Sequence, residues 1–252
     1  MEINGSVAIV TGANRGIGAA FVRVFLGAGA RKVYAGSRDP GAAEALAVEF
    51  PGRCEVIELD VTDEAEVAAA AVRCQDVSIV VNNAGLFTNR LLIGASDMTG
   101  AREEMAVNYF GTLAMCRAFA PVLAKNGGGA ILNVLSAAAI VGVPNMGGYP
   151  PSKAATRFLS TAVRAELEGQ GTQVTSLIVG SVDTRMASHV AGVKEDPDDI
   201  ARAALKALKH GIDEMDTDRM AMEMRAAMAL DPKGTERRLA RMLKSTAIKT
   251  GR

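Results

Sequence analysis

The stretch SVAIVTGANRGIG, residues 6–18, passes from an apolar run into three glycines. The apolar run is typical of a strand buried on both faces. Gly12, Gly16 and Gly18 follow it, ahead of an amphipathic pattern that predicts a helix. Glycine permits a tight turn and a close backbone approach, and the unpaired N–H groups of a helix start attract phosphate. This order of strand, glycine turn and helix therefore predicts a dinucleotide diphosphate site.

The same alternation of strand and helix continues along the chain. Ala-rich helical patterns separate further β-branched runs, and together with the first strand these runs predict strands at 6–11, 31–36, 54–61, 77–82, 130–136 and 173–179. Such alternation gives right-handed crossovers and a parallel sheet covered by helices on both faces. We therefore expect an α/β protein with a doubly wound parallel sheet, a Rossmann fold, in a single domain over residues 1–252.

The pattern changes after residue 184. Residues 184–197 predict a mobile loop beside the substrate, and residues 198–252 a C-terminal helical segment whose first helix is capped by Asp196 or Asp198. The methionine-rich stretch at 215–234 has two interpretations, an adaptable pocket lid or a loosely packed helix. The sequence does not decide between them.

Composition excludes several classes of function. Twenty-eight basic and 28 acidic side chains leave no net field for nucleic acid. Cys54, Cys74 and Cys116 lack C-x-x-C spacing and only two histidines occur, so we expect no metal site and buried free thiols in a reducing compartment. The first residues lack a signal-peptide pattern, and no apolar run approaches the roughly 20 residues that span a bilayer. We expect a cytoplasmic protein with no membrane partner.

Several motifs carry a resemblance to a known family. The glycine spacing is G-x-x-x-G-x-G at 12–18, NNAG follows the fourth expected strand at 82–85, and LDV occupies 59–61. Over residues 5–185 the chain resembles the short-chain dehydrogenase/reductase family in its classical single-domain form. The resemblance implies a homodimer or homotetramer and these cofactor-binding residues: Gly12, Asn14, Arg15, Gly16, Ile17, Gly18, Ser37, Arg38, Asp60, Val61, Asn82, Ala84, Gly85, Tyr149, Lys153, Val182 and Thr184.

A tyrosine and a lysine stand four positions apart in GGYPPSKAAT, residues 147–156. Carbonyl reduction needs a proton donor at the developing alkoxide, and a phenol can supply it if its pKa, ordinarily about 10, is lowered by a neighbouring ammonium. The resemblance implies a tetrad with Tyr149 as proton donor, Lys153 lowering its pKa, Ser136 orienting the carbonyl and Asn108 supporting a proton-relay water.

Two departures from the family pattern bear on this site. Pro150 and Pro151 follow the tyrosine, and we expect the helix to start there, with Tyr149 as N-cap or pre-helical residue, because proline is tolerated in a first turn. Val179 stands where the family usually has proline before Gly180. We expect Val182 and Thr184 still to contact the nicotinamide carboxamide.

The end of the second strand, in VYAGSRDP, bears on the choice of cofactor. A carboxylate there accepts from the ribose hydroxyls of NAD, whereas a guanidinium pairs with the 2′-phosphate of NADP. Ser37 stands where NAD-preferring relatives have aspartate, and Arg38 follows, with Arg15 able to approach the same phosphate. We therefore expect NADPH rather than NADH. The alternative is that Arg38 and Asp39 form an exposed turn pair and that Asp39 serves NAD.

Together these features predict an NADPH-dependent reductase of a ketone or aldehyde, reversibly an alcohol dehydrogenase, acting on a small molecule. One alternative is a non-catalytic dinucleotide-binding sensor or scaffold; another is an epimerase or dehydratase of a sugar nucleotide, for which the C-terminal segment is short. The loops at 86–98, 137–148 and 184–197 carry few charges, which favours an apolar or aryl substrate unless their side chains pack beneath the loops.

Overall fold

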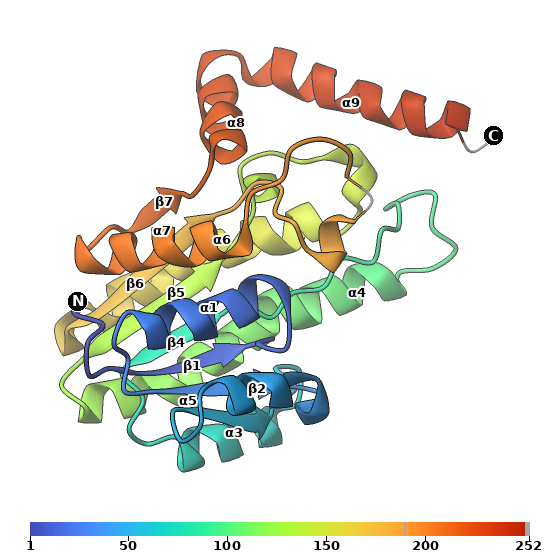
Figure 1. Cartoon of the computed structure of the whole chain (residues 1–252). Helices are drawn as coiled ribbons and strands as arrows, with labels where there is room; N and C mark the ends of the chain where they lie inside the picture. The colour runs from blue at the N-terminus through green and yellow to red at the C-terminus, as the bar shows by residue number, and fades with distance from the viewer. Residues whose placement is uncertain (189, 250–252) are drawn as a thin grey trace.

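A computed structural model describes residues 1–188 and 190–249. The described residues form one seven-stranded parallel sheet (Figure 1) in the order β3-β2-β1-β4-β5-β6-β7. The strands are β1 (Val7–Thr11), β2 (Lys32–Ser37), β3 (Cys54–Glu58), β4 (Ile79–Asn82), β5 (Gly129–Val134), β6 (Thr172–Ile178) and β7 (Glu214–Asp216). The doubly wound fold is confirmed, and its order reverses beside β1, where such sheets bind their ligands.

Helices cover both faces of the sheet. On one face α1 (Gly16–Gly27) packs beside α7 (Pro197–Lys209), and on the other lie α3 (Glu64–Arg73), α5 (Thr112–Lys125) and α6 (Tyr149–Leu167). Each face has its own apolar core, one around Phe21 and Phe25 and one around Phe119. The remaining helices are α2 (Glu44–Glu49), α4 (Thr99–Met105), α8 (Arg219–Leu230) and α9 (Pro232–Lys249).

Short turns complete the element list. A π-helical turn at Ala106–Gly111 joins α4 to α5 without a break, and five 3-10 turns lie in the connections. These 3-10 turns are Pro40–Ala43, Ala137–Ala139, Pro144–Met146, Glu168–Gln170 and Arg185–Ala187. A π-helical turn inside an α-helix often marks a functional site, and this one carries Asn108.

Three strands end earlier than the sequence predicts, β6 by a single residue, and one strand was not predicted. β3 ends at Glu58 and β5 at Val134, so Asp60, Val61 and Ser136 lie in the loops beyond the sheet. β7 is a half-buried segment of three residues, Glu-Met-Asp, paired with the end of β6. Its sequence has neither β-branched residues nor alternation, so pairing with β6 and not intrinsic preference makes it a strand.

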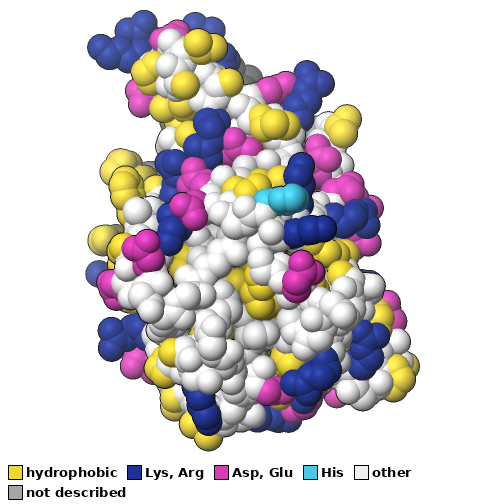
Figure 2. All heavy atoms as spheres, turned by 90° about the vertical axis from the view of Figure 1, so that its left-hand side faces the viewer, with side chains coloured by type: hydrophobic (Ala, Val, Ile, Leu, Met, Phe, Trp, Pro, Cys, Tyr) yellow, Lys and Arg dark blue, Asp and Glu magenta, His cyan; other side chains and the backbone are white. Residues whose placement is uncertain are grey.

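The last two helices project from the sheet layers (Figure 1). α8 contains most of the methionine-rich stretch at 215–234, and Ala221 is the one described residue of α8 that is buried. Met220, Met222 and Leu230 are exposed, and Figure 2 shows apolar, basic and acidic side chains intermixed on this projecting part. No helix in the described ranges is both long and apolar enough to cross a bilayer.

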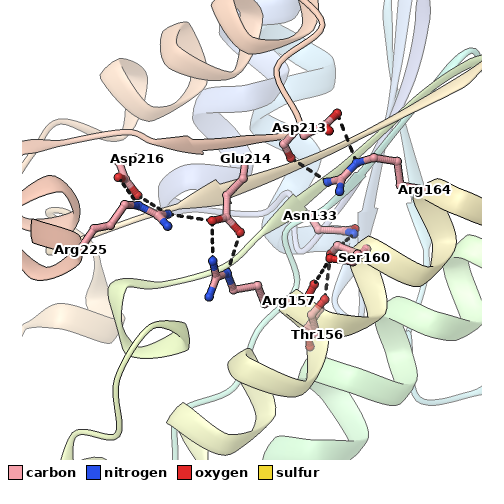
Figure 3. A network of polar contacts seen from close by, with 10 residues as sticks. Asn133, Thr156, Arg157, Ser160, Arg164, Asp213, Glu214, Asp216 and Arg225 are labelled. Carbon is pink, nitrogen blue, oxygen red and sulfur yellow. Dashed lines mark hydrogen bonds and ion pairs between the residues drawn. The ribbon is translucent and has the colours of Figure 1, made fainter. Parts of the chain in front are cut away.

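An ionic network ties the C-terminal segment to α6 (Figure 3). Glu214 on β7 accepts two hydrogen bonds from Arg157 of α6, at 2.7 and 2.8 Å, and pairs with Arg225 of α8 at 2.8 Å. Arg225 also binds Asp216 through two nitrogens. Burial opposes ionisation of Glu214, but the two arginines outweigh it and lower the pKa of its carboxyl. This network thereby ties α6 to β7 and α8, which are consecutive with each other but distant from α6 in the sequence.

A second tie joins α8 to the end of β6. Asp218 is buried; its Oδ1 accepts from the Ala221 N–H at 2.9 Å and so caps α8. Its Oδ2 accepts from the Gly180 N–H at 2.6 Å and from the Thr217 hydroxyl at 2.9 Å. One carboxylate therefore both starts α8 and fixes the loop that follows β6.

We expect Asp218→Ala to destabilise the protein by roughly 2–3 kcal/mol, because it removes a helix cap and leaves the half-buried Gly180 N–H without its acceptor. Urea unfolding measures the change. Asp196→Ala is the matched control: Asp196 also caps a helix, α7, but through one exposed hydrogen bond to the Asp198 N–H, so its loss should cost about 1 kcal/mol or less. Equal losses in the two variants would contradict the role given to Asp218.

Candidate active site

A cavity of about 950 Å³ lies where the carboxyl ends of the central strands meet. Every cofactor and catalytic residue that the sequence predicts lines it, with two exceptions, Asn82 and Asn108. Residues from the glycine turn, the end of β2, the NNAG segment and α6 share this one space, although they are up to about 140 positions apart in the sequence. The carboxyl edge of the sheet thus gathers the predicted site.

The glycine turn has the backbone that its residues require. Gly12 and Gly16 have φ of +65° and +54°, which favour glycine. A Cβ on Gly18 would lie 2.2 Å from the Gly12 carbonyl oxygen, and one on Gly12 would lie 3.0 Å from the Ala84 Cα. α1 begins at Gly16, with its unpaired N–H groups at the cavity. This cradle, which side chains would fill, fits a dinucleotide diphosphate.

The NNAG segment holds the glycine turn in place. The Asn83 side chain donates to the carbonyl oxygens of Thr11, at 2.9 Å, and Gly12, at 3.2 Å, and the Thr11 hydroxyl accepts from the N–H groups of Asn83 and Ala84. Asn82, predicted to bind cofactor, is buried in β4 and donates to Asn133 of β5 at 2.8 Å. Asn83 lines the cavity instead. The second asparagine of the NNAG motif is the feature of the sequence that could have identified Asn83.

The end of β2 presents both candidate charges to the cavity. Ser37 is buried, and its hydroxyl donates to the Asp39 carbonyl at 2.9 Å. Arg38 and Asp39 are both exposed and both line the cavity, as does the exposed Arg15. Within residues 1–188 and 190–249 neither Arg15 nor Arg38 forms an ion pair. Two unpaired guanidinium groups therefore face the place expected for the cofactor's ribose.

Across the cavity, Asp60 and Val61 occupy the loop after β3. Asp60 Oδ1 accepts from the Thr62 N–H at 2.9 Å and the Thr62 hydroxyl at 2.7 Å, which fixes the turn. Val61 is buried against Gly111 of the π-helical turn, where an added Cβ would lie 2.6 Å from Val61 Cγ2. Both residues line the cavity beside Leu59.

Tyr149, Lys153 and Ser136 line the cavity together. Burial raises the pKa of Tyr149 to about 12; a hydrogen bond with Ser136 opposes the rise and the charge of Glu104 adds to it. Lys153 Nζ donates to the Val134 carbonyl at 2.8 Å and lies 5.8 Å from the Tyr149 ring centre, and burial lowers its pKa to about 8. The sequence analysis expected a lowered phenol pKa. In this structure burial raises the pKa of Tyr149 more than the hydrogen bond with Ser136 lowers it.

Asn108 lies in the π-helical turn and forms hydrogen bonds to the loop that follows β4. Its Oδ1 accepts from the Leu86 N–H at 2.8 Å, and its Nδ2 donates to the Leu86 carbonyl at 3.0 Å and to Ser152 Oγ at 2.8 Å. Its backbone carbonyl accepts from the hydroxyls of Thr112 and Thr156, both at 2.9 Å. The backbone carbonyl of Asn108 thus already accepts two hydrogen bonds. The proton-relay water that Asn108 is expected to support remains a prediction.

A buried polar chain anchors α6 to the sheet behind the site (Figure 3). Asn133 donates to Ser160 Oγ at 2.8 Å, Ser160 donates to the Thr156 carbonyl at 2.8 Å, and Thr156 donates to Asn108. All four residues are almost fully buried. Because buried polar groups are costly unless paired, this chain favours one placement of α6.

The helix that carries the tyrosine begins at the tyrosine. Gly148 is the N-cap of α6, Tyr149 is its first residue, and the Ser152 N–H makes the first helical bond, to the Gly148 carbonyl. Pro150 and Pro151 therefore lie in the first turn, where proline costs no hydrogen bond. The N-cap is one residue earlier than expected, because glycine and not tyrosine ends the preceding turn.

The loop after β6 is fixed despite the missing proline. The Val179 carbonyl accepts from the Ala137 N–H at 2.8 Å, and Asp218 holds the Gly180 N–H. Val182 forms a bridge with Glu195, and Thr184 lies against Gly16. Within the expected substrate loop, residue 189 lies outside the described residues; the others form a 3-10 turn and the return to α7.

The sequence analysis did not identify two residues beside the tyrosine. The Phe87 ring lies 5.5 Å from the Tyr149 ring at 66°. Glu104, on α4, is fully buried and accepts two hydrogen bonds from Thr88. Neither sits in a motif, so no spacing could have singled them out. The described residues contain no cluster of metal-ligating side chains, and the three cysteines are buried and free.

Comparison with known proteins agrees with this geometry. A family model described as short chain dehydrogenase matches residues 6–194. Galactitol 2-dehydrogenase (L-tagatose-forming) of Cereibacter sphaeroides is 36% identical over 191 residues, covering 73% of this chain and 74% of the relative. Dehydrogenase/reductase SDR family member 7B of Mus musculus is 31% identical over 196 residues, which are 73% of this chain and 60% of the mouse protein.

A solved structure extends the likeness to the whole fold. A short chain dehydrogenase from Burkholderia cenocepacia J2315, crystallised in complex with NADP, matches with a TM-score of 0.90 and 42% identity. The match covers 95% of this chain and 99% of that one. The family model spans more than half of the chain, so the chain belongs to the short-chain dehydrogenase/reductase family and is an NAD(P)-dependent oxidoreductase.

Proposed function

We propose that this protein reduces a ketone or aldehyde to an alcohol, reversibly, with Tyr149 as the proton donor. The observation that carries the proposal is the grouping of Tyr149, Ser136 and Lys153 in the same cavity as the glycine turn, which fits a diphosphate. A cofactor cavity alone would suit a sensor or scaffold. A buried phenol paired with a hydroxyl and an ammonium has no use in such a protein, which favours catalysis.

Each residue of the group has a distinct task. NADPH, when bound, supplies the hydride. Ser136, half-buried at the end of β5, donates to the substrate oxygen and orients it toward the phenol. Tyr149 gives its proton to the developing alkoxide. Lys153, held by the Val134 carbonyl, keeps an ammonium close to the phenol and lowers the cost of the phenolate that proton transfer leaves. Asn108 forms hydrogen bonds both to α6 and to the loop that follows β4, and so holds the two together.

The same proposal includes NADP(H) as cofactor. Gly12, Gly16 and Gly18 would hold the diphosphate, and Arg15 and Arg38 would pair with the 2′-phosphate. The family relative crystallised with NADP supports this choice. Asp39 is the competing group, since a carboxylate at this place would repel the 2′-phosphate and accept from the ribose of NAD.

The substrate is a small carbonyl compound or alcohol with an apolar or aryl part. Leu86, Phe87 and Met186 line the cavity near Tyr149, and they offer apolar contacts to a substrate. Galactitol dehydrogenase among the relatives shows that polyols also occur in the family. We further propose a cytoplasmic homodimer or homotetramer.

Tyr149→Phe should reduce carbonyl reduction by about 10²–10⁴-fold, because it removes the proton donor and leaves the ring. Cofactor oxidation with a panel of aryl and alkyl ketones measures turnover, and cofactor binding is measured separately by titration. Binding should stay within a few-fold of the unmodified protein. Near-normal turnover in the variant would overturn the assignment; tight binding without turnover in the unmodified protein would instead favour the sensor.

The double substitution Pro150→Ser with Pro151→Ala should change activity less than about tenfold, since both residues lie in the first turn of α6 and make no interior kink. Turnover and the thermal midpoint are measured together. A large loss of turnover in a folded variant would show that the prolines orient Tyr149.

Arg38→Ala should lower kcat/KM for NADPH by about tenfold or more, about 1.4 kcal/mol, and leave NADH almost unchanged, because the guanidinium meets a phosphate that NADH lacks. The unmodified protein should prefer NADPH by about tenfold or more. Asp39→Ala is the matched control: it should leave NADPH use intact or improve it. A preference for NADH, abolished by Asp39→Ala, would reverse the assignment.

A further inference from the structure

Glu104 is a fully buried carboxyl group with half of its hydrogen-bonding capacity unused. Its Oε1 accepts from the Thr88 N–H at 2.7 Å and the Thr88 hydroxyl at 2.9 Å. Its Oε2 is buried and has no hydrogen-bond partner among the described residues. A buried polar atom without a partner costs free energy, so an unpaired oxygen beside an active site requires an explanation.

The unpaired oxygen lies against the start of the helix that carries the phenol. A Cβ on Gly148 would lie 2.7 Å from Glu104 Oε2 and 2.9 Å from the Ala101 Cα, so glycine is required there. Gly148 is the N-cap of α6 and directly precedes Tyr149. A small cavity of about 70 Å³ adjoins this point, lined by Glu104, Gly148 and the loop from Thr88 to Met98.

The start of a helix normally neutralises such a carboxylate through its unpaired N–H groups. In α6 the second and third residues are Pro150 and Pro151, which have no N–H. This pair of prolines therefore leaves fewer N–H donors at the helix start beside Glu104. The unusual Pro-Pro pair of YPPSK thus offers a reason why Glu104 Oε2 has no hydrogen-bond partner among the described residues.

The charged side chains around Glu104 have other partners or lie outside. Lys153, one turn further along α6, donates to the Val134 carbonyl. Arg90, in the loop above, pairs with Asp97 at 3.3 Å. Arg102 and Glu103, on α4 itself, are exposed. In the described part of the chain, Glu104 thus has no counter-ion.

We propose that Glu104 is a positioning residue for Tyr149: one oxygen holds the loop at 86–98 beside the site, and the other sets a negative charge next to the start of the phenol-bearing helix. A negative charge opposes formation of a second one on the phenol. Consistent with this, after burial the charge of Glu104 raises the pKa of Tyr149. The residue therefore adds to the effect of burial, which keeps the phenol protonated as carbonyl reduction requires; this consequence rests on the proposed function.

The test measures the ionisation of Tyr149 directly, without turnover. The chain has three tyrosines, Tyr34, Tyr109 and Tyr149, and no tryptophan. Incorporation of 3-fluorotyrosine gives each of them a ¹⁹F resonance, and fluorination lowers the pKa of a phenol, which brings the titration closer to neutrality. The resonance that is missing in Tyr149→Phe assigns Tyr149. Its titration midpoint is then compared between variants.

Glu104→Gln removes the charge and keeps an oxygen for Thr88, so the Tyr149 midpoint should fall by about half a pH unit or more. Glu103→Gln, an exposed neighbour on the same helix, should leave the midpoint unchanged. Thr88→Val removes one donor to Oε1 and keeps the charge, so it should not lower the midpoint. An unchanged midpoint in folded Glu104→Gln, or equal shifts in the Glu103 and Glu104 variants, would overturn the proposal.

A second variant tests the same proposal in case Glu104→Gln does not fold. Replacing both side chains by apolar groups, Glu104→Leu with Thr88→Val, removes the charge together with the Thr88 hydroxyl, so that only the half-buried Thr88 backbone N–H loses its acceptor. It should lower the midpoint as Glu104→Gln does, and an unchanged midpoint there would also overturn the proposal. Carbonyl reduction needs the protonated phenol, so its rate falls as the pH rises through the pKa of Tyr149. In both variants this alkaline loss of activity should begin at a lower pH. If Tyr149→Phe stays active while the midpoint shift occurs, the proposed function fails and the role of Glu104 stands.

Discussion

The site depends on one hydrogen bond, from the buried ammonium of Lys153 to the carbonyl oxygen of Val134 at the end of β5. Burial of an ammonium is costly, and this bond and the nearby phenol offset part of that cost. Because Lys153 lies one turn after Tyr149 in α6, fixing the lysine on the sheet also fixes the tyrosine. Ser136, two residues beyond Val134, then lies within reach of the phenol. The carboxyl end of one strand thus positions the three side chains to which we assign the chemistry.

The constraint extends from the sheet into the C-terminal segment. The polar chain through Asn133, Ser160 and Thr156 holds the inner face of α6, and Arg157 on its outer side holds β7 through Glu214. From β7 the chain reaches Asp218, which accepts from the Gly180 N–H in the loop after β6. A carboxylate at the start of α8 thus fixes this loop, in which Val179 precedes Gly180. Loop geometry and the docking of α8 are therefore coupled.

Sequence reasoning reached the parts of the molecule that follow local rules. A strand followed by a glycine turn has few backbone solutions, so the diphosphate cradle and the doubly wound fold could be predicted from residues 6–18 and the alternation after them. It did not reach β7, whose three residues become a strand through pairing with β6, or Asp218 and Glu104, whose importance lies in what they touch. The expected low pKa of Tyr149 failed for the same reason, because burial is a property of the folded protein.

The prolines after Tyr149 show how a departure from a family pattern can carry chemical information. In the first turn they cost α6 nothing as a helix, which is why the fold tolerates them. They remove N–H groups that a helix start would otherwise offer to a nearby acceptor. Glu104 Oε2 lies beside this helix start, buried and without a hydrogen-bond partner among the described residues. The electrostatic effect of a carboxylate on the phenol is stronger in a buried environment than in water, and in the described residues only one of the two Glu104 oxygens is hydrogen-bonded. In the proposal for Glu104, the prolines that depart from the family pattern therefore bear on proton transfer and not on helix formation.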